Sequence, residues 1–176
     1  VQFDLKPTAR VGVIGIGGLG HMAVQFLNKW GCEVTAFTSS EAKRTEALEL
    51  GAHRTLDSRD KAALKAAAGY FDLIISTVNV ELDWGGYIRT LRPKGRLHLV
   101  GAVLEPVKIS VMALMSGQRS VSSSPVGSPA VIAQMLEFAA RHRIEPKVEV
   151  FPMADVNAAI DRLENGSPRY RVVLKR

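Results

Sequence analysis

A glycine-rich turn, set between a short apolar run and an amphipathic segment, constrains this chain more than any other sequence feature. Residues 10–15 read RVGVIG, and residues 15–20 read GIGGLG, which matches G-x-G-x-x-G. Apolar residues from Leu19 to Trp30 recur at helical spacing, and Gly31 ends that segment. A strand–turn–helix context is where such a loop holds the pyrophosphate of a dinucleotide, although a glycine-rich turn without a ligand is the alternative.

Each glycine of this loop has its own expected task. Gly15 permits a tight turn, Gly17 lets the backbone approach a pyrophosphate, and Gly20 lets the helix lie close to the strand. The free N–H groups at the start of the helix attract phosphates. The next residue, His21, is interpreted as part of the first helical turn rather than as a phosphate contact. The predicted phosphate loop comprises Gly15, Gly17, Gly18, Leu19 and Gly20.

Further apolar runs alternate with helix-period segments along the chain. Strands are expected at residues 33–37, 71–78 and 96–101, and helices at 41–50, 82–91 and 129–143. Continuous apolar runs are typical of parallel strands buried on both faces, and strand–helix alternation implies right-handed crossovers. The sequence therefore predicts an α/β fold over residues 1–148: a Rossmann-type, doubly wound, parallel six-stranded sheet with helices on both faces.

The pattern changes after residue 148. A strand at residues 147–151, a helix at 156–163 with Asp155 as its N-cap, and a strand at 171–175 are expected in a C-terminal tail, residues 149–176.

Composition narrows the possible functions. The chain has 176 residues, 47% hydrophobic and 23% charged, and no apolar run reaches the ~18–20 residues of a membrane span. Its net charge of +6 suits an anionic ligand, and the scattered basic residues argue against nucleic acid. The single cysteine, Cys32, excludes an intrachain disulfide and favours a reducing, cytoplasmic compartment. The opening run lacks an initiating Met and a signal peptide, so a piece of a longer chain is expected.

The end of the second expected strand favours NADP over NAD. NAD-binding domains place an acid about 20 residues beyond the loop, on the ribose 2′-hydroxyl. Here residues 38–44 read TSSEAKR, and Glu41 is expected to face away from the ribose. Donors and positive charge for a 2′-phosphate would come from Ser39, Ser40, Lys43 and Arg44. Alternatively, or in addition, Ser40 is an N-cap and the two cations form a solvated helix face.

Several stretches together carry a family resemblance: VGVIGIGGLGHMAVQFLNKWG, VTAFTSSEAKR, LGA at residues 50–52, LRPKGRLHLVGA, and the closing YRVVL. In these the chain resembles the cofactor domain of zinc-type medium-chain alcohol dehydrogenases, in the branch of cinnamyl alcohol dehydrogenases and bacterial aldehyde reductases. The resemblance implies hydride transfer between NADP(H) and a primary alcohol or aldehyde, with a catalytic zinc that polarises the carbonyl oxygen.

The resemblance also implies what this chain lacks. In the family the zinc ligands lie N-terminal to the cofactor domain, and neither that motif nor the four-cysteine zinc lobe occurs here. The chain alone is therefore expected to carry no catalytic residue, to bind no stoichiometric zinc and to be inactive. Cys32 is interpreted as a small buried core residue rather than a ligand.

Further cofactor contacts follow from the same resemblance: Thr77, Val78 and Asn79 near the riboses, Val100, Gly101 and Ala102 along the nicotinamide, Ser123 and Ser124 at its carboxamide, and Arg171 at the pyrophosphate. The alternative for Arg171 is a surface residue of an edge strand. The resemblance further implies a homodimer, joined edge to edge through a strand near residues 119–124. It also implies a tail that belongs to the catalytic domain.

Two other functions remain open from the sequence. One is a stand-alone Rossmann module that senses a dinucleotide without catalysis. The other is an S-adenosylmethionine-dependent methyltransferase, which the missing strand-end acid disfavours. Zinc ligands encoded upstream of Val1 would favour the dehydrogenase.

Overall fold

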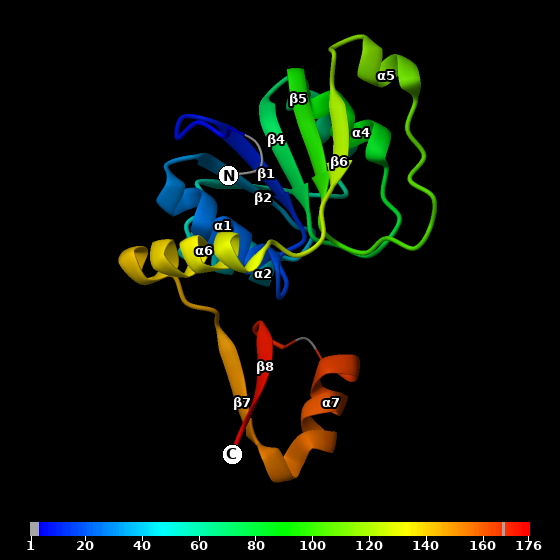
Figure 1. The fold of residues 1–176 in the computed structure, drawn as a ribbon. Coiled ribbons are helices and arrows are strands. Elements are labelled where there is room, and N and C mark those ends of the chain that lie inside the picture. Colours follow the sequence, from blue (N-terminus) through cyan, green and yellow to red (C-terminus); the bar gives the residue numbers. More distant parts are fainter. Residues whose placement is uncertain (1–3, 167) are drawn as a thin grey trace.

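The computed structural model describes residues 4–166 and 168–176, and its main body is a six-stranded parallel sheet in the order β3-β2-β1-β4-β5-β6 (Figure 1). The strands are β1 (Arg10–Ile14), β2 (Glu33–Phe37), β3 (Arg54–Leu56), β4 (Phe71–Ser76), β5 (Leu91–Leu99) and β6 (Ser120–Ser123). The strand order reverses between β1 and β4, and a doubly wound sheet binds ligands at the carboxyl ends of the strands beside such a switch point. The predicted Rossmann sheet is confirmed.

Helices cover both faces of the sheet, as predicted. They are α1 (Gly20–Trp30), α2 (Glu41–Glu49), α3 (Lys61–Ala66), α4 (Trp84–Thr90), α5 (Val111–Met115) and α6 (Pro129–His142). On one face, Val24 of α1 and Ala47 of α2 belong to a buried cluster with Val11 of β1. On the other face, Tyr87 of α4 is buried in a cluster with Phe37 of β2. Burial of each large apolar side chain stabilises the fold by about 1.5–3 kcal/mol.

Side chains of successive strand residues point to opposite faces of the sheet, which explains why there are two buried clusters.

Helix α6 lies beside α1 (Figure 1), where the Phe138 ring stacks on the Phe26 ring with 5.9 Å between centroids. No helix within residues 4–166 and 168–176 is long and apolar enough to cross a bilayer.

Three short elements escaped the sequence analysis: β3, α3 and α5. Strand β3 has only three residues, which is too few to show a period, and it lies at the edge of the sheet. Helix α3 has six residues, and its start depends on the Asp60 side chain, which accepts from the N–H groups of Ala62 and Ala63. Strand β5 begins at Leu91 rather than at residue 96.

The C-terminal segment forms a second, two-stranded sheet, which projects from the main body (Figure 1). It contains β7 (Val148–Pro152), a 3-10 turn η1 (Met153–Asp155), α7 (Val156–Asn165) and β8 (Arg171–Lys175), with β7 parallel to β8. Asp155 is the N-cap residue of α7, as predicted, but its side chain makes no capping hydrogen bond, and the 3-10 turn leads directly into the helix.

One carboxylate joins the parts of this unit. Glu149 of β7 accepts from Arg162 Nε at 2.7 Å and Nη2 at 3.0 Å, and from the N–H group of Arg169 at 2.8 Å. The Arg162 guanidinium and that N–H group lower the pKa of Glu149 to about 2. A two-stranded sheet is marginal by itself, so these bonds and α7 hold the unit together.

Acid should therefore loosen the C-terminal unit through Glu149. Its pKa is depressed in the folded chain, so its contribution to stability is complete above about pH 4.5 and is lost as the pH falls toward about 2. We expect Glu149→Gln to destabilise the chain at pH 7, and the difference from the unmodified chain to shrink on acidification. Urea unfolding at a series of pH values measures this, and a pH-independent difference would contradict it.

Candidate functional site

The glycine loop joins β1 to α1 at the carboxyl end of the sheet. Gly15 has a φ of +85°, a conformation that favours glycine, and a Cβ on Gly20 would overlap the carbonyl oxygen of Gly15. A Cβ on Gly17, by contrast, would meet nothing within 4 Å. The loop is thus closed behind and open in front, which is the geometry that a pyrophosphate cradle requires.

The ends of β4 and β5 brace this loop. Thr77 Oγ1 donates to the carbonyl oxygens of Gly15 at 2.8 Å and Ile14 at 3.0 Å. A Cβ on Gly101 would overlap the carbonyl oxygen of Val78, so the two strand ends lie in close contact. The structure thus brings Thr77, Val78 and Gly101 beside the glycine loop. Exposed at the same strand ends are Asn79, Val100 and Ala102.

The start of α2 supplies polar and cationic groups. Ser40 is the N-cap, and its side chain accepts from the N–H group of Lys43 at 3.4 Å, so the predicted cap is confirmed. Arg44 is held by two carboxylates: Nη2 lies 2.8 Å from Asp57 and Nη1 lies 3.1 Å from Glu41. The Glu41 side chain is 85% exposed and turns toward Arg44.

A pocket of about 500 Å³ joins three segments that are far apart in the sequence. Its lining includes Gly17 and Gly18 of the loop, Lys43 of α2, and Arg171 of β8. Arg171 Nη1 lies 3.5 Å from the carbonyl oxygen of Gly18. Two cations and the exposed start of a helix therefore face one cavity, which suits a ligand with several phosphates. Leu19 is exposed beside it, and Ser39 is exposed just before α2.

The predicted carboxamide residues, Ser123 and Ser124, lie at the carboxyl end of β6. Ser123 Oγ donates to the carbonyl oxygen of Leu99 at 2.8 Å. Ser124 Oγ lies 2.9 Å from His98 Nε2, while His98 Nδ1 lies 3.0 Å from Ser122 Oγ. Burial lowers the pKa of His98, which is 4% exposed. The sequence analysis missed His98, because no local pattern shows that its ring contacts Ser122 of β6 and Ser124 just after that strand.

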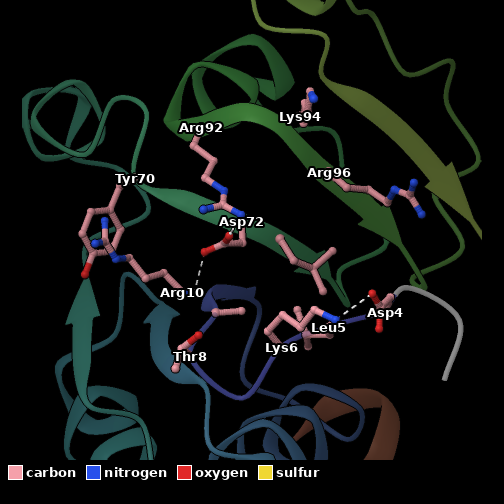
Figure 2. A pocket seen from close by; sticks show the side chains of 12 residues that line it. Asp4, Leu5, Lys6, Thr8, Arg10, Tyr70, Asp72, Arg92, Lys94 and Arg96 are labelled. Carbon is pink, nitrogen blue, oxygen red and sulfur yellow. Dashed lines mark hydrogen bonds and ion pairs between the residues drawn. The ribbon is translucent and has the colours of Figure 1, made fainter.

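A second pocket, of about 550 Å³, opens at the amino ends of β1, β4 and β5 (Figure 2). Its charges are largely paired with one another: Arg92 with Asp72, and Lys6 with Asp4 at 2.8 Å. The Arg10 guanidinium lies 4.7 Å from the centre of the Tyr70 ring. This pocket lies at the opposite end of the strands from the glycine loop, so it is separate from the predicted dinucleotide site.

The described residues do not fit a zinc centre. Across residues 4–166 and 168–176, no three His, Cys, Asp or Glu side chains gather where they could hold a metal ion. Cys32 is 1% exposed, and burial raises the pKa of its thiol to about 11. Its predicted place in the core is confirmed.

Known proteins resemble this chain in both sequence and fold. A family model described as zinc-binding dehydrogenase matches residues 18–141. Aldehyde reductase AdhA from Synechocystis sp. is 63% identical over 174 residues, covering 99% of this chain and 52% of that protein. A cinnamyl alcohol dehydrogenase structure from Sorghum bicolor (SbCAD4) has a TM-score of 0.90 at 42% identity, covering 96% of this chain and 48% of that one.

A structure of CAD from Helicobacter pylori complexed with NADP(H) has a TM-score of 0.79 at 29% identity, covering 95% of this chain and 47% of that one. This chain thus spans about half the length of these relatives. The matches confirm the family resemblance inferred from the sequence.

Two glycine substitutions should separate folding from binding. Gly20→Ala forces a Cβ against the Gly15 carbonyl and is expected to lower the free energy of unfolding by about 3 kcal/mol. Gly17→Ala projects into open space, so stability should change by no more than about 0.5 kcal/mol. The Gly17 methyl should nevertheless weaken dinucleotide binding about 10-fold, or about 1.4 kcal/mol. Urea unfolding and a cofactor titration measure both effects, and unchanged binding by Gly17→Ala would contradict the cradle.

Proposed function

This chain belongs to the zinc-binding dehydrogenase family, and we propose that it is the NADP(H)-binding half of an alcohol dehydrogenase or aldehyde reductase. The complete protein would transfer hydride between NADP(H) and a primary alcohol or aldehyde. The pocket shared by the glycine loop, Lys43 and Arg171 carries this proposal. An aldehyde reductase as relative and an NADP(H)-bound CAD structure support it.

Different residues of the chain would hold the different parts of the cofactor. The open face of Gly17, the N–H groups at the start of α1, and Arg171 would bind the pyrophosphate. The residues at the strand ends that brace the loop would hold the riboses and the nicotinamide: Thr77, Val78, Asn79, Val100, Gly101 and Ala102, with Ser123 and Ser124 at the carboxamide. The bound nicotinamide supplies or accepts the hydride. The substrate and the zinc ligands would come from the remaining half.

Selection of the 2′-phosphate would rest mainly on Lys43 and Ser39. Lys43 lines the pocket, and Ser39 is exposed at the end of β2. Arg44 would contribute less, because Asp57 and Glu41 already balance its charge. No carboxylate stands at position 39 to repel a phosphate or to hold the 2′-hydroxyl of NADH.

We expect the chain to bind NADPH more tightly than NADH by about 30- to 1,000-fold, or about 2–4 kcal/mol. Lys43→Ala should weaken NADPH binding while leaving NADH nearly unchanged, and Arg44→Ala should do so to a smaller extent. Ser39→Asp should reverse the preference, since it repels the phosphate and can hold the 2′-hydroxyl. Titration of both cofactors against each variant measures this. Equal affinities of the unmodified chain for NADPH and NADH would contradict NADP selection.

We further propose a homodimer through β6, the outermost strand on its side of the sheet. Such two-fold pairing covers an exposed strand edge. Large apolar side chains in the segment that leads into β6 support it: Leu104 is 93% exposed, and Val111, Met112 and Met115 are each about two-thirds exposed. The C-terminal unit presents Val148, Val150 and Val173 on an exposed sheet face, which suits docking against the remaining half. A cytoplasmic location remains a prediction.

Sedimentation should therefore show dimers at about tens of micromolar, the range in which a modest interface is tested. Met112→Asp places a charge in the proposed interface and should shift the chain toward monomer. Met135→Asp, on an exposed residue of α6 away from β6, is the matched control and should leave the dimer intact. A monomeric unmodified chain would overturn the proposal.

A further inference from the structure

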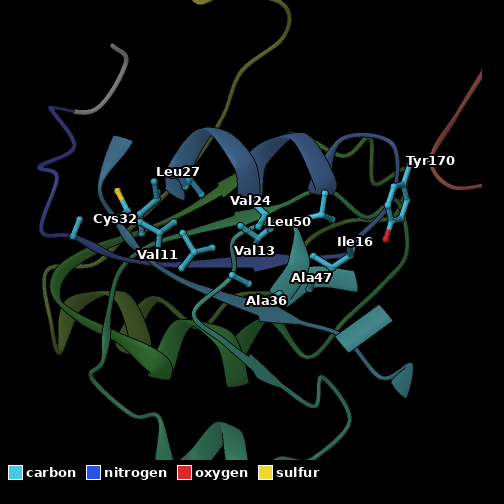
Figure 3. Packing of buried hydrophobic residues seen from close by; sticks show 14 residues of the cluster. Val11, Val13, Ile16, Val24, Leu27, Cys32, Ala36, Ala47, Leu50 and Tyr170 are labelled. Carbon is cyan, nitrogen blue, oxygen red and sulfur yellow. The ribbon is translucent and has the colours of Figure 1, made fainter. Parts of the chain in front are cut away.

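A tyrosine from the C-terminal segment completes the core of the main domain. Tyr170, directly before β8, is 4% exposed and belongs to the same buried cluster as Ile16, Ala47 and Leu50 (Figure 3). Its ring stacks on the His21 ring, with centroids 4.7 Å apart and planes inclined by 17°. The tail therefore reaches the first turn of α1, directly behind the glycine loop.

His21 in turn contacts the glycine loop. Its side chain is fully buried, and Nδ1 lies 2.9 Å from the carbonyl oxygen of Gly17, to which it donates. Nε2 has no hydrogen-bond partner among the described residues, and burial lowers the pKa of the ring. The imidazole thus lies between the Tyr170 ring and the Gly17 carbonyl oxygen and connects the tail to the loop.

Tyr170 also reaches α2, the helix that carries Lys43. Its hydroxyl donates to Glu46, and Arg169 Nε donates to the same carboxylate at 2.6 Å. Burial alone would raise the pKa of Glu46, but these two hydrogen bonds hold it below its usual value. Glu46 lies one turn after Lys43, so an ionised carboxylate ties the tail to the helix that supplies a pocket cation.

We infer that residues 169–171 form a clasp that fixes the glycine loop and α2 at the separation the dinucleotide requires, with His21, Glu46 and Tyr170 as positioning residues. This inference rests on the proposed function. Arg171 extends from the clasp to Gly18, while Tyr170 touches the elements behind the pocket. The pyrophosphate and the 2′-phosphate belong to one ligand, so their binding groups on α1 and α2 must be held at a matching distance before binding.

Removal of the Glu46 carboxylate should change the affinity for NADPH in opposite directions, depending on whether Glu46 acts through its charge or as a positioning residue. Glu46 is a negative charge within a turn of Lys43, so if it acted only by its charge, its removal would strengthen the binding of an anion. If Glu46 instead anchors the clasp, its removal frees α2 and weakens that binding. Glu49, on the same helix, offers a matched control: it pairs with Lys147 at 3.6 Å, and within the described part of the chain it forms no ion pair with Arg169 or Arg171.

The test is a fluorescence titration of the 176-residue chain with NADPH. We expect Glu46→Ala to weaken NADPH binding about 10-fold, whereas Glu49→Ala should change it by less than about 2-fold. Both variants place alanine on the same helix and remove the same charge. Equal or tighter binding by Glu46→Ala would overturn the clasp. An unmodified chain that binds no NADPH would overturn the proposed function as well.

A second pair of variants separates positioning from general destabilisation. Tyr170→Phe keeps the ring on His21 and loses the hydroxyl, whereas Tyr170→Leu loses both contacts. We expect Tyr170→Phe to retain NADPH affinity within about 3-fold of the unmodified chain, and Tyr170→Leu to lose about 10-fold or more. Thermal unfolding without cofactor shows whether each variant is folded at the titration temperature. Folded Leu and Phe variants of equal affinity would overturn the role of the ring.

Discussion

The close approach of Gly20 to the carbonyl oxygen of Gly15 sets the geometry on which the rest of the site depends. No residue with a side chain fits at position 20, so the first turn of α1 can lie directly on the end of β1. That placement turns the free N–H groups of α1 toward the crevice and leaves Gly17 open in front. It also sets His21 behind the loop, where its ring contacts both Gly17 and the tail.

The cationic side chains fall into two groups: those paired with carboxylates, and those that line the pocket. Arg162 and Arg169 are committed to Glu149 and Glu46, and Arg44 is balanced by Asp57 and Glu41. Lys43 and Arg171 instead face the pocket beside the loop. A positive net charge alone therefore says little about function. The lining of the pocket decides which charges are placed for a phosphate-bearing ligand.

Long, locally determined elements followed from the sequence, and short, context-dependent ones did not. The apolar runs of β1, β2 and β4 matched buried parallel strands, and the Ser40 cap was readable because it lies three residues from the N–H group it binds. Strand β3 and helix α3 are too short for periodicity, and they form because neighbouring strands and the Asp60 side chain support them. Asp155 shows the same limit, because the sequence located the N-cap residue but not the 3-10 turn that precedes it, nor the missing side-chain hydrogen bond.

The sequence by itself determined the Rossmann sheet, the glycine cradle, the absence of an acid at the end of β2 and the family. Each of these depends on residues within one strand–turn–helix unit, where spacing alone brings the groups together. Only the tertiary structure decided that Tyr170 completes the core and that its hydroxyl donates to Glu46, 124 positions away. Only the structure, likewise, showed that Arg44 is paired with a carboxylate while Lys43 lines the pocket. Such contacts join segments remote in sequence, and no local period records them, because they form only when the sheet and the tail have folded against one another.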